Sequence, residues 1–280
     1  MPELKRNKNL DRDEEGVATT VGTIMALLIF LSVLSLITQQ YVPVWMHDNE
    51  AYHMQEVRGE FADFKRSIDN LAEDRNYPQY HSQYSSLKLG TDGIPIFASA
   101  TPGRVTYEPG NESSQMSLRF FSEDENRFLS RNSSGNFRYR ARNREFEDQS
   151  LIYEHGAIIL EQEDKSVMRA RPQLYIDEDS VSMTMINFVG SSEDISGNGR
   201  VDINIERAGL DTTTHPVDED EDFNLTIDTP YTTAWANYLE NETSLGSDEV
   251  ESGEDSVEIR DYTPDEINLT RLSVKVDITV

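Results

Sequence analysis

Cysteine is absent from the 280-residue sequence. Its absence excludes disulfide bonds, thiolate metal sites and cysteine nucleophiles together. Secreted domains of this size often use disulfides, so a fold without them must be held by packing alone. The hydrophobic fraction is also low, at 36%, and we therefore expect a core of modest size.

Basic residues are scarce: 25 Lys and Arg stand against 52 Asp and Glu, which gives a formal net charge of -27. Nucleic-acid binding needs a basic surface that neutralises phosphates, so the sequence predicts no nucleic-acid partner. Two explanations of the acidity remain open. One is a protein that binds cations or basic partners, and the other is a surface adapted to high salt, where ions screen the repulsion between carboxylates. The acids are dispersed along the chain, which favours the second.

Recognisable catalytic motifs are also missing. The five histidines include no HExxH motif and no pair four residues apart, and the chain has no P-loop, GxGxxG or GxSxG motif. We therefore expect no enzymatic activity, no cofactor and no metal site. A tethered hydrolase that acts through two carboxylates, for instance on glycans, is the enzymatic alternative.

Only one long hydrophobic run is present. Residues 17–46 carry no charged side chain, and residues 24–37 are almost wholly apolar. About 20 helical residues cross the hydrocarbon core of a bilayer, so we expect a transmembrane helix over residues 17–46. A cleaved secretory signal peptide is the main alternative, but the sequence TQQYVPVW that follows the run has no small-x-small cleavage site.

The charges beside this run predict its orientation. Four basic residues precede it, and three acidic residues follow it before the first arginine beyond the run. These residues are Lys5, Arg6, Lys8 and Arg12 before the run and Asp48, Glu50 and Glu56 after it. The positive-inside rule then places a leader of residues 1–16 in the cytoplasm and the long remainder outside the cell. We expect a single-pass protein of the cell membrane, with lipid as a partner.

Residues 47–76 have helical periodicity. Six apolar residues recur at spacings of three and four, which places them in one stripe along a helix. They are Met54, Val57, Phe61, Phe64, Ile68 and Leu71. We expect an amphipathic helix outside the membrane, with a kink near Pro43. Its stripe needs a partner, which is either the protein's own head or the helix of a neighbouring subunit.

From residue 77 onward the apolar residues alternate with period two. Clear runs are 181–185, 201–205, 223–227 and 274–280. Alternate apolar residues line one face of a strand, and breaks rich in Gly, Pro, Asn and Asp separate the runs. We therefore expect an α+β fold, in which a long N-terminal transmembrane and amphipathic helix precedes a mainly antiparallel, β-sandwich-like head over residues 77–280.

One motif in the head has two interpretations. Residues 194–202 (DISGNGRVD) place oxygen-bearing side chains as in the first half of a calcium loop. The dipeptide Asn198-Gly199 between alternating runs is also a strong signal of a β-hairpin turn, and we favour the hairpin.

Two charged segments also have competing interpretations. Residues 138–144 carry arginine at every second position, which predicts either a solvent face paired with carboxylates or a docking stripe for an acidic partner or a phosphate. We favour the solvent face. The acidic run 218–222 is expected to be a solvated loop rather than a cation site.

Five Asn-x-Ser/Thr sequons lie beyond the hydrophobic run and none lies before it. Such motifs can accept N-linked glycans on exposed segments. The candidate sites are Asn111, Asn132, Asn224, Asn241 and Asn268. Their distribution agrees with an exposed, glycosylated head.

The N-terminal segment has a distinctive order. A polar leader ends at Gly16, and VATTVGTI over residues 17–24 then opens an uncharged helix with an amphipathic continuation. This order resembles archaeal type IV pilin-like and archaellin-like proteins. In that family a membrane peptidase cuts before the hydrophobic helix, which by resemblance places the cut between Gly16 and Val17. The stretches QYVPVWMHDNEAYHM and LKLGTDGIPIFASATPG also look like those of uncharacterised archaeal surface proteins with this N-terminus.

The resemblance implies a pilin-like structural or adhesive component. Its hydrophobic helix would pack against copies of itself or other pilin-like subunits, and small residues such as Ala18, Gly22 and Ala26 let helices approach closely. A non-polymerising single-span anchor that carries a binding module is the alternative.

Overall fold

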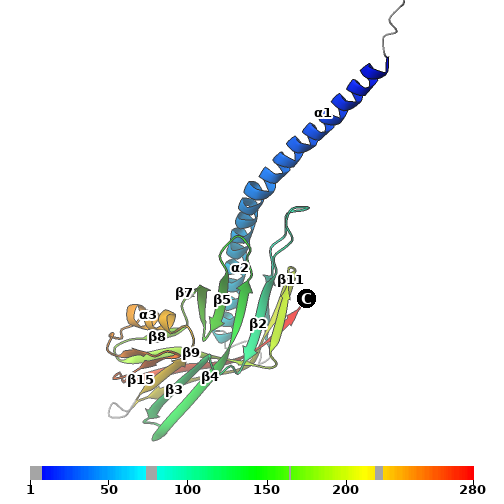
Figure 1. The fold of residues 1–280 in the computed structure, drawn as a ribbon. Coiled ribbons are helices and arrows are strands. Elements are labelled where there is room, and N and C mark those ends of the chain that lie inside the picture. Colours follow the sequence, from blue (N-terminus) through cyan, green and yellow to red (C-terminus); the bar gives the residue numbers. More distant parts are fainter. Residues whose placement is uncertain (1–7, 74–80, 164, 218–222) are drawn as a thin grey trace, which may run out of the picture.

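The computed structural model describes residues 8–73, 81–163, 165–217 and 223–280 and, for residues 8–16, the backbone alone. In these residues a long helical rod projects from a β-rich head (Figure 1). The acidic run 218–222 lies outside the described residues.

The rod consists of α1 (Lys8–Leu36), a π-helical turn η1 (Ile37–Tyr41) and α2 (Val42–Glu73). The backbone N–H of Val42 donates to the carbonyl of Ile37, the wider spacing of a π turn. Pro43 follows directly, and a proline has no N–H and crowds the carbonyl four residues before it, which here lies inside η1. The predicted kink is therefore a π turn within a continuous helical rod, and Figure 1 shows the change of direction between α1 and α2.

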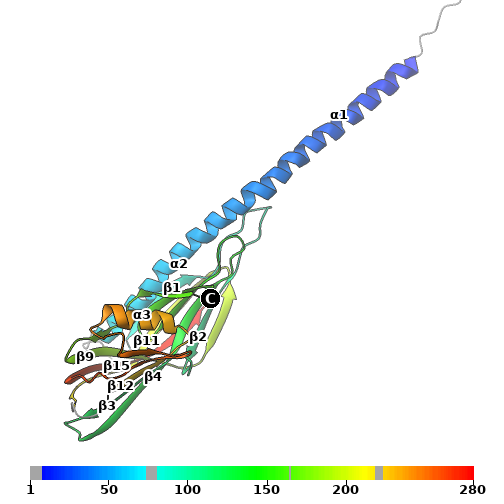
Figure 2. The same cartoon turned by 60° about the vertical axis from the view of Figure 1, so that its left-hand side comes forward.

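The apolar run lies in the part of the rod that leaves the head. Of the described residues, one helix is long and apolar enough to cross a membrane: Val17–Glu73, with a mean hydropathy of 2.4 in its most apolar window and none of that window buried. Many residues after the window are buried, because α2 lies against the head (Figure 2).

The predicted stripe of α2 is the part that packs on the head. All six of its residues are at most 1% exposed: Met54, Val57, Phe61, Phe64, Ile68 and Leu71. Burial of each such side chain stabilises the fold by about 1.5–3 kcal/mol. Of the two partners expected for this stripe, the protein's own head is therefore the one that covers it.

The described residues of the head form two sheets. The first has the strand order β1-β11-β15-β9-β8. Its strands are β1 (Ser82–Lys88), β11 (Arg200–Pro216), β15 (Glu266–Thr279), β9 (Ser180–Val189) and β8 (Leu174–Ile176). Among the described pairings, that of β9 with β15 alone is parallel.

The second sheet has the main order β13-β14-β12-β3-β4-β5-β6-β7, with β2 paired to β4 and β10 paired to β2. Its strands are β13 (Val250–Ser252), β14 (Ser256–Ile259), β12 (Asn224–Asp228), β3 (Gln115–Ser122), β4 (Arg127–Ala141), β5 (Gln149–Glu154), β6 (Ala157–Gln162), β7 (Lys165–Ala170), β2 (Gly103–Pro109) and β10 (Glu193–Gly197). The first half of β4 pairs with β3 and its second half pairs with β2 and β5.

A short helix, α3 (Thr232–Glu242), lies within the region where only strands and loops were expected. Its buried residues Ala234, Trp235, Tyr238 and Leu239 follow helical spacing. The helix contacts β7, β13 and β14 at the side of the head (Figure 2).

The core is divided into two hydrophobic clusters. One joins the stripe of α2 to residues of both sheets, and the other joins α3 to β3, β12 and β14. Strand β5 contributes to both, because Leu151 and Tyr153 face the α2 cluster while Ile152 faces the α3 cluster. All six of its residues are buried, as expected for a strand covered on both faces.

These elements confirm the α+β class: a long apolar helix is followed by a mostly antiparallel β-rich domain. The hairpin predicted at Asn198-Gly199 is wrong. Strand β10 before this turn pairs with β2, and β11 after it pairs with β1 and β15. The turn therefore carries the chain from one sheet to the other instead of closing a hairpin.

Candidate membrane-contact region and other candidate sites

The surface of α1 is a continuous apolar sleeve. Eleven large hydrophobic residues between positions 17 and 36 are 47% or more exposed. They are Val17, Val21, Ile24, Met25, Leu27, Leu28, Ile29, Phe30, Leu31, Val33 and Leu36. A surface of this kind is stable only when lipid or other helices cover it.

The hydroxyl groups of this helix bond to its own backbone. Thr23 Oγ1 donates to the carbonyl of Thr19 at 2.8 Å, and Ser32 Oγ donates to that of Leu28 at 2.7 Å. Thr38 does the same with Leu34 at 3.0 Å. A hydroxyl satisfied in this way can enter hydrocarbon without losing a hydrogen bond, so these polar residues are compatible with a membrane span.

Aromatic side chains mark the end of the sleeve. Tyr41 and Trp45 are 51% and 46% exposed, and their ring centroids are 6.1 Å apart. Tyrosine and tryptophan are enriched where a membrane meets water, because their rings have an apolar body and a polar tip. Tyr41 and Trp45 thus have the composition and the position expected of such an aromatic belt.

The predicted processing position, Gly16-Val17, lies inside α1, where the helix runs on without a break. Val17 is 63% exposed. Cleavage between these residues stays a prediction.

The junction of rod and head is fixed by a buried carboxylate. Glu50 of α2 is fully buried and accepts three backbone N–H bonds at 2.8 Å, from Arg144, Glu145 and Phe146. Consecutive amides that converge on one anion form a strong charge-assisted contact. The ring of His47 also packs edge-on against Phe146, at 5.3 Å. The loop between β4 and β5 therefore holds α2 just on the head side of Tyr41 and Trp45.

Replacement of Glu50 by alanine should destabilise the chain by about 2 kcal/mol, because three amides lose a charged acceptor although water can reach the opened loop. Hydrogen exchange at residues 144–146 should accelerate in the same variant. Asp63→Ala is the control, since its side chain is 61% exposed and its ion pair with Arg66 lies on the surface. Equal protection of the loop in both variants would show that Glu50 does not hold it.

The sequon asparagines differ in exposure. Asn132 on β4 and Asn241 on α3 are exposed, whereas Asn111, Asn224 and Asn268 are half-buried. Asn268 accepts a bond from Thr214 Oγ1 at 2.7 Å and donates to Glu266 at 2.8 Å. Glycosylation stays a prediction for all five.

The arginine segment, residues 138–144, lies only in part on a strand. Arg138 on β4 pairs with Glu161 at 2.5 Å, as expected for a face lined with carboxylates. Arg142 and Arg144 lie beyond the strand, in the loop gripped by Glu50, and Arg144 Nη2 donates to Ser99 Oγ at 3.1 Å.

The calcium-like motif is not assembled as a metal site. Asp194 forms an ion pair with Arg104 of the neighbouring strand β2. Among the described residues no group of three or more His, Asp or Glu side chains is placed to hold a metal ion.

A buried polar cluster lies at the turn between β5 and β6. Glu154 is fully buried and accepts bonds from Thr229 Oγ1 at 2.6 Å, Trp235 Nε1 at 2.7 Å and Ser114 Oγ at 3.0 Å. Burial raises the pKa of its carboxyl, although the three donors oppose that shift. Sequence reasoning missed this cluster, because its donors are far apart in the chain.

His155 follows at the same turn, with a left-handed φ of 48° and 1% exposure. Its Nδ1 lies 3.5 Å from Ser133 Oγ, and its Nε2 has no hydrogen-bond partner among the described residues. Burial lowers the pKa of His155 to about 3. Ser133, Glu154 and His155 are thus all enclosed in the core, and none of them is more than 2% exposed.

The His155 pKa predicts a loss of stability in acid. A lowered folded-state pKa contributes stability above the unfolded value of 6.5 that is lost as the pH falls toward 3. Between pH 8 and pH 5 this loss should be about 2 kcal/mol. His155→Asn should reduce it, since asparagine tolerates the left-handed backbone and does not titrate. Urea unfolding of the full-length chain in detergent at both pH values measures the effect.

His47→Asn is the matched control for this experiment. The His47 side chain is 51% exposed, so its replacement should leave the acid loss intact. An acid loss that is the same in both variants and in the wild type would contradict the assignment to His155.

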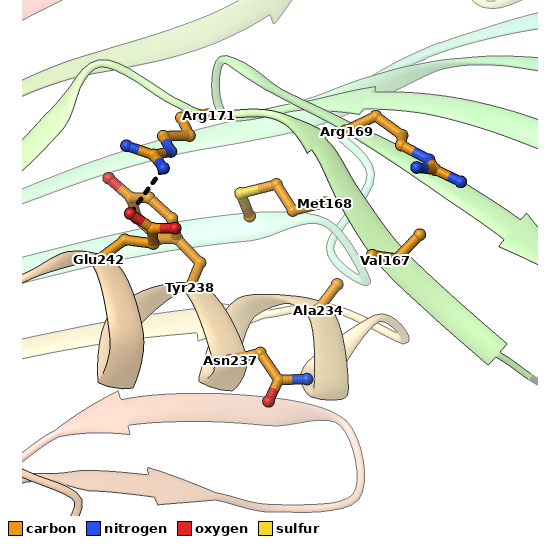
Figure 3. A pocket seen from close by; sticks show the side chains of 8 residues that line it. All are labelled: Val167, Met168, Arg169, Arg171, Ala234, Asn237, Tyr238 and Glu242. Carbon is orange, nitrogen blue, oxygen red and sulfur yellow. Dashed lines mark ion pairs between the residues drawn. The ribbon is translucent and has the colours of Figure 1, made fainter.

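A groove lies between β7 and α3 (Figure 3). Its lining residues are Val167, Met168, Arg169, Arg171, Ala234, Asn237, Tyr238 and Glu242. Glu242 is the one carboxylate in this lining, and it is paired with Arg171 at 2.6 Å (Figure 3). The groove thus lacks the two carboxylates that a glycan hydrolase would need.

Comparisons with known proteins identify a family. No curated protein and no solved structure matches the chain. A model for a family of unknown function, DUF7289, matches residues 16–278, from the end of the predicted leader to the last strand. The chain therefore belongs to the DUF7289 family.

Proposed function

We propose that the protein is a membrane-anchored surface protein whose single N-terminal span holds the β-rich head outside the cell. The observation that carries this proposal is the helix Val17–Glu73, which has no buried residue in its apolar window and buries one face of its amphipathic half against the head. An apolar sleeve that the head does not cover requires another apolar environment. The role is non-enzymatic, which agrees with the enclosed Ser133–His155 cluster.

The orientation is N-terminus inside. Basic residues cluster before the span and acidic residues follow it, and this asymmetry sets the direction of insertion. A head outside the cell also agrees with the five sequons, since all of them lie after residue 76.

Within this proposal the protein is a pilin-like structural or adhesive component of the archaeal type. Because α2 is covered by its own head, α1 is the part of the rod that stays available for neighbouring helices. A side chain built at Gly22 would meet nothing within 4 Å, so this side of α1 is open to close approach. The two sheets enclose a shared core, and we describe the head as sandwich-like on that ground.

The second candidate is a single-span anchor that never polymerises and carries a binding module. Residues 13–15, just before Gly16, are all acidic, whereas the archaeal leader pattern favours a basic residue beside the glycine. An uncut leader would keep the helix in the membrane.

The anchor is tested by charge insertion. Leu28→Arg combined with Ile29→Arg should cost about 5–7 kcal/mol of insertion free energy and release the full-length protein from the membrane fraction. The matched control places the same two arginines on the head, at Val167 and Tyr175, which are 46% and 68% exposed. Membrane retention of the span variant, with a folded head, would overturn the proposed anchor.

The two candidates are separated by the mass of the mature N-terminus. An N-terminus at Val17, together with filaments that are lost when Gly16 is replaced, would support the pilin-like component. An intact leader in the membrane-bound protein would favour the non-polymerising anchor.

A further inference from the structure

The connection between β1 and β2, residues 89–102, runs along α2 toward α1, the part of the rod that carries the apolar run. The N–H of Lys88 donates to Glu60 Oε2 at 2.8 Å, and the carbonyl of Leu89 lies 3.3 Å from His53 Nε2. Further along, Ser99 is bonded to Arg144, whose own N–H bonds to Glu50. Each step reaches an earlier turn of α2, and Figures 1 and 2 both show this loop rising beside the rod.

The tip of this loop is ordered by its own backbone. Thr91 pairs with Thr101 and Ile94 pairs with Ala98, so the loop is a narrow hairpin-like finger. The N–H groups of Phe97 and Ala98 both donate to the carbonyl of Ile94, at 3.0 and 2.9 Å. We call residues 94–98 the tip.

Two apolar side chains project from the tip into the surroundings. Ile96 is 101% exposed and Phe97 is 39% exposed. Ile96 also has a φ of 73°, a left-handed conformation that is rare for a β-branched residue. A fully exposed isoleucine contributes nothing to the packing of the head, so packing does not account for its strained backbone. Strained residues of this kind gather at functional contact sites.

The tip and the residues beside it carry no charged side chain, although the chain as a whole is highly charged. Residues 93–101 (GIPIFASAT) contain no Asp, Glu, Lys or Arg, although 28% of the chain is charged. A loop exposed only to water has no need of this composition, whereas a lipid interface excludes charged side chains.

The height of the tip matches the end of the span. From Glu50 to Tyr41 the rod rises about 14 Å, at about 1.5 Å per residue. Figures 1 and 2 show the loop reaching the part of the rod where α1 passes into α2, and Tyr41 is the last residue of the η1 turn at that junction. The tip therefore approaches the level of the exposed aromatic belt of Tyr41 and Trp45.

We propose that Ile96 and Phe97 insert into the lipid interface beside the span and form a second membrane contact. This inference rests on the proposed membrane anchor. One helix alone leaves the head free to tilt and rotate, whereas a second contact at a fixed distance from the helix sets its orientation. The grip of Glu50 on residues 144–146, together with the Arg144–Ser99 bond, braces the loop in this position.

The absence of cysteine allows a direct test. Three single-cysteine variants of the full-length protein, Ile96→Cys, Leu31→Cys and Asp124→Cys, carry a polarity-sensitive fluorophore in the tip, in the span and in the β3–β4 turn at the far end of the head (Figure 1). Each is reconstituted in phosphatidylcholine and phosphatidylglycerol vesicles without nitroxide lipid, with lipid that bears a nitroxide near the headgroup end of its chains, and with lipid that bears it near the middle of the chains. We expect blue-shifted emission and several-fold stronger quenching at position 96 than at position 124.

The outcomes separate this inference from the anchor. Quenching at position 31 without quenching at position 96 would overturn the second contact and leave the anchor standing. Quenching at neither position would overturn the anchor as well. A blue shift at position 96 that ignores the nitroxide lipid and grows with protein density would assign the tip to another copy of the chain, which also overturns the inference.

A second pair of variants tests the side chain beside the label. In the Ile96→Cys background, Phe97→Ser should weaken the quenching at the tip. Phe128→Ser is the matched control, because Phe128 is 40% exposed and lies on β4 at the far end of the head. Equal quenching in both would contradict a role for Phe97.

Discussion

Replacement of Glu154 by leucine should lower the free energy of unfolding by about 3–5 kcal/mol. The carboxyl group is the shared acceptor for Trp235 of α3, Thr229 before that helix and Ser114 just before β3. Leucine fills similar space but accepts nothing, so three buried donors lose their partner. Desolvation of such groups outweighs the gain from removing one buried acid.

Glu154→Gln is the control that keeps the shape. Its amide oxygen can still accept from Trp235 and Thr229, while its NH2 group can donate to Ser114, so the loss should stay within about 1 kcal/mol. Urea unfolding in detergent, followed by the fluorescence of buried Trp235, measures both variants. A leucine variant as stable as the glutamine variant would refute the structural role of the cluster.

The stability contributions of Glu154 and His155 depend on pH in opposite directions. The raised pKa of Glu154 contributes stability below its unfolded pKa and loses it as the pH rises through the folded value. The lowered pKa of His155 contributes stability above pH 6.5 and loses it as the pH falls. Two adjacent residues therefore limit the stable range from both sides. Glu154→Gln should compare more favourably with the wild type at pH 7 than at pH 4.

Local periodicity predicted much of the fold. The stripe from Met54 to Leu71 is buried as expected, because side chains three and four residues apart share one face of a helix. Val201, Ile203 and Ile205 are buried in the same way on β11, where alternate residues share one face. The expected alternation of buried and exposed residues breaks down on β9, where the adjacent residues Met185 and Ile186 are both buried.

Pairing between distant strands was beyond sequence reasoning. Asn198-Gly199 has the composition of a hairpin turn, but β2 and β15 compete for the flanking strands and draw them into different sheets. The parallel contact of β9 with β15 has no local signal. Helix α3 did have one, since Ala234 and Tyr238, and Trp235 and Leu239, are each four residues apart.

The candidate region was predicted in part. The candidate span follows from hydrophobicity alone, because no other helix among the described residues is long and apolar enough. Glu50 could not be singled out among 52 acidic residues, since its role depends on amides about 95 positions away. The uncharged stretch 93–101 was visible in the sequence, but its meaning depends on where the loop lies beside α2.

The rod and the head form one folded unit only if the stripe of α2 is part of the core, and Phe64 tests this most sharply. Its ring is 1% exposed, stacks on Phe137 at 4.3 Å and meets Tyr153 edge-on at 5.4 Å. Phe64→Ala should destabilise the head by about 3–5 kcal/mol, through lost apolar burial, a cavity and two aromatic contacts. Phe64→Leu should cost less, because it refills most of the cavity.

Tyr52→Ala is the control on the same helix, since Tyr52 is 71% exposed and its loss should change stability by about 0.5 kcal/mol or less. Urea unfolding in detergent with circular dichroism measures all three variants. Membrane fractionation should be unchanged in each, because α1 is untouched and its insertion does not depend on the head. If Phe64→Ala and Tyr52→Ala unfolded alike, α2 would be a separate stalk, and neither the grip of Glu50 nor the height of the tip above the membrane could be fixed by the fold.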